Sequence, residues 1–130
     1  MPAPDLPRTV TSVLVEEVAG SVTVTWVLGD PVETRAPEYF GYGMYYYNPA
    51  GNGGKRFGVR FSAEIAAWIF DNETATQANY LADSVTATTD AVVVHFNDAT
   101  LGSLEIGTVA AYAHIEAHDE QLEIPVSLLR

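Results

Sequence analysis

The sequence predicts an all-β protein built as a sandwich of two antiparallel sheets. The clearest sign is residues 21–28, where apolar and polar side chains alternate with a period of two before the turn sequence Gly29-Asp30-Pro31. Such alternation is typical of a strand with one buried face and one solvated face. Similar short segments recur between turn residues, and no long segment shows a helical period. We therefore expect roughly seven to nine strands and at most one short helix.

The first half of the chain predicts two hairpins. Residues 9–18 and 21–28 are both β-rich and only a short turn separates them, so we expect them to pair. Residues 39–48 and 55–62 flank a glycine-rich turn at 49–54, where glycine and asparagine tolerate the backbone angles of a tight reversal. We expect this second pair to form an aromatic-rich hairpin.

The second half predicts four further strands, at residues 65–70, 91–97, 108–117 and 122–129. The first of these is uniformly apolar, which indicates a strand covered on both faces or an edge that lies under a loop. Pro125 favours an edge position for the last strand, because proline cannot donate a hydrogen bond to a neighbour. Residues 98–104 are expected to form a loop with a helical turn, and residues 118–121 a polar turn.

Residues 74–83 form the one segment that favours a helix. Thr74 and Gln77 fit a capping box. One side of the helix would be lined by Ala75, Ala78, Leu81 and Ala82. A helix of this length is marginal in isolation, so the sequence leaves its formation open.

The composition describes one acidic domain. The chain has 130 residues, with 17 acidic against 6 basic residues, a formal net charge of -11 and no cysteine. Disulfides and thiolate metal sites are excluded, and a strongly acidic surface repels nucleic acid and anionic lipid. We expect no membrane insertion, since no apolar run approaches the ~20 residues that span a bilayer. We expect an extended arm at 1–8, rich in proline, before a single domain at 9–130.

The first residues lack the basic start and the apolar centre of a signal peptide. We therefore expect synthesis in the cytoplasm, followed by incorporation into a virion or another assembly.

Three short motifs resemble those of fibronectin type III and related immunoglobulin-like modules. Leu6-Pro7, followed by residues 22–26, resembles the first two strands of that family with the core tryptophan at Trp26. Residues 42–47 resemble its third strand, and residues 104–108 are similar to the turn before its penultimate strand. The resemblance implies an immunoglobulin-like sandwich with Trp26 in its core, although a jelly-roll-like sandwich fits the strand pattern too. It also implies a module that binds rather than catalyses.

An aromatic run in the second hairpin is the first candidate site. It contains six residues within nine positions: Tyr39, Phe40, Tyr42, Tyr45, Tyr46 and Tyr47. Because neighbouring residues of a strand face opposite ways, both faces carry aromatic side chains. Tyrosine combines a rigid apolar body with a polar tip, which suits a protein partner or stacked sugar rings. Alternatively, one row belongs to the core and the other packs under long loops.

A basic corner lies on the partner strand of the same hairpin. Lys55, Arg56 and Arg60 make up half of the six bases of the chain. They are candidates to meet a carboxylate or phosphate, or to pair with acids of neighbouring strands or of other subunits. Our predicted interaction site therefore consists of Tyr42, Tyr45, Tyr46, Tyr47, Lys55, Arg56 and Arg60, with oligomerisation through the hairpin at 39–61.

Metal and catalytic sites have weaker support. The acidic loop residues Asp71, Asp98 and Asp119 lack the alternating spacing of a calcium loop, and turn chemistry explains them. His114, Glu116 and His118 would share a strand face, and a metal there would need His95 alongside. No glycine-flanked nucleophile elbow occurs.

We therefore expect a non-enzymatic structural or interaction module with no cofactor or metal. A protein partner or a second copy of the chain is the expected ligand, as in a subunit of a phage tail or capsid. The alternative is a carbohydrate-binding module that uses the same tyrosines or Trp68, and an acid-based hydrolase is a third class.

Overall fold

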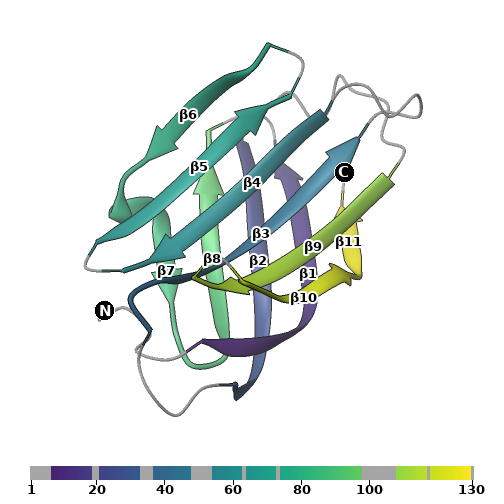
Figure 1. Ribbon diagram of the computed structural model, residues 1–130. Coiled ribbons are helices and arrows are strands. Elements are labelled where there is room, and N and C mark those ends of the chain that lie inside the picture. Colours follow the sequence, from purple (N-terminus) through teal and green to yellow (C-terminus); the bar gives the residue numbers. More distant parts are fainter. Residues whose placement is uncertain are drawn as a thin grey trace.

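The computed structural model describes residues 7–18, 21–32, 37–47, 54–62, 64–72, 74–97, 108–116 and 118–129. Within these ranges the chain forms two facing β-sheets (Figure 1). The one helical segment described there is a 3-10 turn at Ala82–Ser84, and no described helix has the length and apolarity to cross a membrane. The predicted all-β sandwich of two largely antiparallel sheets is confirmed.

The first sheet has five strands in the order β11-β1-β2-β8-β7. Its strands are β1 (Arg8–Val18), β2 (Ser21–Pro31), β7 (Val85–Ala87), β8 (Ala91–Phe96) and β11 (Val126–Leu129). β1 and β2 form the predicted hairpin, with Val18 opposite Ser21. β1 and β11 pair in parallel, and the other pairs of this sheet are antiparallel.

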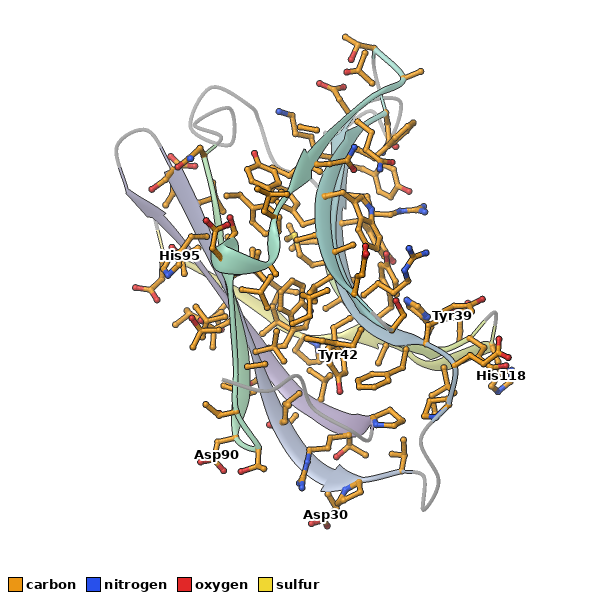
Figure 2. All side chains as sticks on the ribbon, turned by 90° about the vertical axis from the view of Figure 1, so that its left-hand side faces the viewer. Asp30, Tyr39, Tyr42, Asp90, His95 and His118 are labelled. Atoms are coloured by element: carbon orange, nitrogen blue, oxygen red, sulfur yellow. The ribbon has the colours of Figure 1, made fainter. Side chains whose placement is uncertain are left out.

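The second sheet has six strands in the order β10-β9-β3-β4-β5-β6, all antiparallel. Its strands are β3 (Phe40–Tyr47), β4 (Gly54–Phe61), β5 (Ile65–Asp71), β6 (Thr76–Tyr80), β9 (Thr108–Ile115) and β10 (His118–Ile124). β3 and β4 form the predicted aromatic hairpin and occupy the centre of the sheet. Figure 2 shows this sheet bent, with its concave side turned away from the five-stranded sheet.

The core fills the space between the sheets with the inward residues of each alternating strand. Along β2, Val22, Val24 and Trp26 are fully buried, while the residues between them are partly exposed. The Trp26 indole Nε1 donates a hydrogen bond of 3.2 Å to the carbonyl of Gly43 on the opposite sheet. The expectation that Trp26 is a core residue is confirmed, and its one polar atom is satisfied inside the core.

Residues 74–83, for which the sequence left a helix open, form no helix apart from the 3-10 turn that begins at Ala82. The chain instead turns at Ala75, where φ is 55°, and returns along β5 as strand β6, with Thr76 opposite Asp71. A helix would have needed Leu81 on a buried side, whereas its side chain is 77% exposed. Pairing with β5 satisfies the backbone groups of this segment without any apolar stripe, which a short helix needs for stability.

The structure has eleven strands in its described part, so the expected number of seven to nine is wrong. The predicted polar turn at 118–121 belongs to β10, because the reversal after β9 occurs one step earlier, at Glu116 with φ of 51°. The predicted last strand is divided at Pro125, where the chain leaves one sheet and joins the other. Both β10 and β11 lie at sheet edges, as the proline predicted.

Some expectations fall outside the described residues. They are the proline-rich residues 1–6, most of the turn at 49–54, and the loop at 98–104. Of the predicted arm at 1–8, Arg8 already belongs to β1, and the carbonyl of Pro7 accepts a hydrogen bond of 3.0 Å from the backbone N–H of Val32.

Candidate binding face

The outward side of the six-stranded sheet, here called the outer face, carries most of the aromatic and cationic candidates. Alternation along β3 and β4 sends Phe40, Tyr42, Met44, Phe57, Val59 and Phe61 into the core. Their neighbours therefore face outward. The outward residues of the central strands are Gly41, Gly43, Tyr45 and Tyr47 on β3, Arg56, Gly58 and Arg60 on β4, Trp68 on β5, and Tyr112 and His114 on β9.

Glycines at the centre of the outer face let neighbouring rings lie across the backbone. Tyr112 covers Gly43 so closely that a Cβ there would overlap the phenol ring. Trp68 covers Gly58 from the other side in the same way. Gly43 and Gly58 are direct cross-strand partners, so the two rings approach each other along one row of the sheet. This arrangement holds large aromatic side chains flat on the sheet.

A pocket of about 350 Å³ opens on the outer face beside Tyr112. It is lined by Tyr45, Tyr47, Arg56, Tyr112 and Asp119, which come from β3, β4, β9 and β10. The rings of Tyr45 and Tyr47 are tilted by 53° to each other, with centroids 5.3 Å apart. The pocket thus combines aromatic walls with a guanidinium donor, a carboxylate acceptor and phenol hydroxyls.

The charged side chains that line the pocket nearly cancel each other. Arg56 and Asp119 bring one positive and one negative charge to the same lining. Burial raises the pKa of the Tyr112 phenol; Arg56 opposes this rise, while Asp119 and Tyr47 add to it. At neutral pH Tyr112 is therefore an uncharged hydroxyl that can both donate and accept hydrogen bonds.

A row of stacked side chains extends the outer face beyond the pocket. Tyr112 stacks on His114 with ring centroids 6.4 Å apart, and His114 meets Tyr39 edge-on at 6.2 Å. The Arg60 guanidinium carbon lies 5.9 Å from the centroid of the Tyr39 ring, within range of a cation–π contact. The His114 imidazole is held by Nδ1, which lies 3.0 Å from the carbonyl oxygen of Glu116 and donates to it.

The outer face also gathers the exposed cations of this acidic chain. Four of the six bases lie in the described residues. Lys55 is buried, and Arg8 is half-buried with its guanidinium bonded to the carbonyl of Gly29. The two exposed ones, Arg56 and Arg60, are both on the outer face. An acidic partner would therefore find positive charge on this face of the described surface.

The structure brings together four of the seven predicted interaction residues, namely Tyr45, Tyr47, Arg56 and Arg60. Tyr42 is instead a core residue with 2% exposure, and its hydroxyl accepts a hydrogen bond of 3.1 Å from the backbone N–H of Arg8. Figure 2 shows Tyr42 between the sheets and Tyr39 on the outer side. Lys55 is 7% exposed on the inner side of β4, because consecutive residues of a strand face opposite ways. The side chain of Tyr46 lies outside the described part.

Tyr112 and Asp119 belong to this site but could not be assigned to it from the sequence. From the sequence, Asp119 was a candidate only as an acidic loop residue, and Tyr112 was not a candidate. Gly43 was the available signal, because a glycine inside an aromatic strand often marks the close approach of another group. The sequence could not show which residue approaches Gly43. In the pairing of β3 with β9, Gly43 lies opposite Tyr112, which is 69 positions further along the chain.

The other candidates do not converge. His95 lies on the far side of the five-stranded sheet (Figure 2), with Nδ1 2.9 Å from the hydroxyl of Thr23, so it is remote from His114. Asp71 accepts a hydrogen bond of 3.2 Å from the backbone N–H of Thr74, which is turn chemistry. The described residues contain no group of three or more histidine, aspartate or glutamate side chains placed to hold a metal ion.

Comparisons of the chain with protein-family models, with curated proteins and with solved structures give no match. The geometry of the outer face is therefore the basis on which a function can be proposed.

Proposed function

We propose that this chain is a non-enzymatic interaction module that binds a protein partner through its outer face. The observation that carries the proposal is the pocket, in which three tyrosines and Arg56 converge from the three strands β3, β4 and β9. Tyrosine, tryptophan and arginine dominate the binding energy of protein interfaces, because they combine large rigid area with directed polar groups. Gly43 lets the Tyr112 ring lie against the sheet before binding, and an ordered ring lowers the entropic cost of association.

The strand order supports an immunoglobulin-like sandwich for the proposed module. In such folds the first sheet has the order A-B-E-D and the second contains G-F-C, extended in variable-type domains by C′ and C″. Here β1-β2-β8-β7 follows the first order and β10-β9-β3-β4-β5 the second. Two further strands lie outside these orders, β11 beside β1 and β6 beside β5. The jelly-roll alternative receives no comparable support.

A place in a larger assembly, such as a phage tail or capsid, fits the same proposal. The hairpin β3–β4 lies inside its sheet with both edges paired, so it can meet another subunit only through its outer side. That side presents Tyr45, Tyr47, Arg56 and Arg60 together.

The test compares partner capture by two surface variants. Tyr47→Ala with Arg56→Ala removes two pocket walls, whereas Thr86→Ala with Thr89→Ala changes two exposed residues around the β7–β8 turn, on the other sheet. The native partner is captured from the cells that produce the chain. We expect the first variant to capture at least tenfold less of it than the second variant does. Equal capture by both folded variants would remove the outer face from the proposal.

A carbohydrate ligand is the second candidate, and the chemistry of the pocket favours it. Arg56 and Asp119 offer a donor and an acceptor around aromatic walls without leaving a net charge. That combination suits an uncharged polyhydroxylated ring, whose C–H face packs on tyrosine while its hydroxyls take up hydrogen bonds. Calorimetric titration against a panel of neutral oligosaccharides tests it. Binding that disappears in Asp119→Asn and Tyr112→Phe supports the candidate, and no heat with any oligosaccharide removes it.

A further inference from the structure

The four edge strands of the sandwich differ in how well they are protected against pairing with another chain. An exposed edge offers free backbone donors and acceptors, and proteins block such edges with short strands, charges, bulges or proline. β7 has three residues and β11 has four. β10 carries the exposed Asp119, pairs with two register shifts, and is followed directly by Pro125. These three edges are all protected.

β6 has none of these protections. Its sequence, Thr-Gln-Ala-Asn-Tyr, contains no charge and no proline, and all five residues pair with β5 without a register shift. Its first four residues are exposed, and the described structure pairs it on one side only, at the outer margin of its sheet (Figure 1). The strand is followed directly by Leu81, the most exposed of the large hydrophobic side chains described, at 77%.

We propose that β6 pairs antiparallel with β6 of a second copy of this chain, so that two six-stranded sheets join edge to edge around a two-fold axis. The charge of the chain favours this edge for self-association. With a net charge of -11, two copies repel each other over most of their surfaces, and a neutral strand is a place where they approach at little cost.

The side chains of β6 are self-complementary around an axis at Ala78. Gln77 of one copy then lies opposite Asn79 of the other, and the pair repeats on the other side of the axis. Within one chain the Gln77 Nε2 already donates to Asn79 Oδ1 at 2.8 Å, so both amides lie on the same side of the sheet. Each carries donors and acceptors that can be exchanged with the amide opposite.

The proposed dimer places both outer faces on the same side of one continuous sheet. A two-fold axis perpendicular to the sheet keeps the side-chain faces in register, so the two pockets open in the same direction. A ligand with repeated epitopes would then be held by two sites at once. Because five residues pair in each copy, the interface is small, and we expect association that depends on protein concentration within the micromolar to millimolar range.

A charge exchange on β6 tests the proposal by sedimentation equilibrium. We expect wild-type protein to pass from monomer to dimer with rising concentration. Gln77→Lys with Asn79→Lys, and separately Gln77→Glu with Asn79→Glu, should each weaken dimerisation at least tenfold, since like charges then face each other. An equimolar mixture of the two variants should restore dimers, which loss of folding cannot explain. The surface control Thr89→Lys should dimerise like the wild type.

Three results would overturn the inference. They are a wild-type monomer at millimolar concentration, a dimer that both double variants form as strongly as wild type, and open-ended growth in place of a closed dimer. Amide hydrogen exchange gives an independent reading, because backbone N–H groups of β6 should gain protection with concentration while those of β10 do not. Tyr47→Ala with Arg56→Ala leaves β6 intact and should retain the dimer, which separates this inference from the function proposed for the outer face.

Discussion

Gly41 and Gly43 lie two residues apart on β3 beneath neighbouring side chains, yet their nearest contacts differ. At Gly43 the three nearest atoms to an added Cβ all belong to the Tyr112 ring. At Gly41 the nearest atom is the backbone carbonyl oxygen of Val59, followed by the His114 imidazole. A side-chain tip can rotate away from an added methyl group, whereas a backbone carbonyl moves only if strand β4 shifts.

We predict different costs for the same alanine substitution at these two glycines. Gly43→Ala should lower the free energy of unfolding by about 1 kcal/mol, and Gly41→Ala by about 3 kcal/mol, as expected for overpacking against movable and fixed groups. Chemical denaturation measures both. In a Tyr112→Ala background the cost of Gly43→Ala should vanish while that of Gly41→Ala persists. Equal costs in both backgrounds would show that Tyr112 does not rest on Gly43.

The phenols of Tyr42 and Tyr112 predict how stability changes in alkali. Burial raises the pKa of both above the ordinary value of 10.0. The folded chain then holds these protons more tightly than the unfolded chain. The resulting stabilisation is complete below about pH 10 and is lost as the pH rises through the higher folded value.

Tyr112→Phe removes one of these two ionisations, and it leaves the core hydrogen bond of Tyr42 intact. We predict that the unfolding free energy of this variant falls less steeply than that of wild type between about pH 9 and pH 11. Denaturation curves across that range measure the slope. Identical slopes for the two proteins would contradict the raised pKa of Tyr112.

Among the elements, β6 shows where sequence periodicity is insufficient. Alanines and Leu81 recur at helical spacing in this segment and would lie on one side of a helix. Such a helix is stable only if another surface of the protein covers that side. The structure offers no such surface, since Ala78 and Leu81 are exposed. The strands with clear alternation, such as β2 and β9, were predictable because their period of two alone determines which side chains are buried.

Pairing between distant strands was not predictable in the same way. The sequence contains no local signal that places β9 beside β3 or β8 beside β2, because register comes from how whole faces pack. For the same reason, the full set of residues on the outer face could not be predicted from the sequence. Tyr45, Tyr47 and Arg56 could be proposed from one hairpin, whereas Tyr112 and Asp119 join them only through neighbouring strands of the sheet. Tyr42 and Lys55 were assigned to the surface because both rows of the hairpin looked equally suited to it.

The turn into β6 contains a residue with a strained backbone conformation, and substitution by glycine should relieve that strain. Ala75 has φ of 55°, a left-handed conformation that costs an L-residue about 1 kcal/mol and glycine almost nothing. We predict that Ala75→Gly leaves stability unchanged or raises it by up to about 1 kcal/mol, since the relief is offset by added entropy of the unfolded chain. The matched control Ala78→Gly, in the middle of β6, should lower stability by about 0.5–1 kcal/mol. Equal losses in both variants would argue against the turn at Ala75.

For the whole molecule, net charge opposes both folding and association. The chain holds 17 acidic residues against 6 basic ones, and the described exposed cations are confined to the outer face. Repulsion among the remaining acidic groups therefore acts across most of the surface. The free energy gained by burying apolar side chains between the sheets has to exceed the free energy of this repulsion. At the uncharged edge strand β6, a second copy meets little of the repulsion.

Salt should accordingly stabilise this protein. We predict that raising sodium chloride from about 0.01 M to about 0.15 M shortens the Debye length from about 30 Å to about 8 Å and raises the unfolding free energy by about 1 kcal/mol. For a domain of this size the melting temperature would rise by roughly 4 °C. The double variant Glu64→Gln with Asp83→Asn neutralises two exposed acids. Its unfolding free energy at low salt should be higher than that of wild type, and it should rise less when salt is added. The same salt should strengthen dimerisation through β6. A fall in melting temperature with added salt would mean that attractive ion pairs, and not repulsion among like charges, dominate the surface.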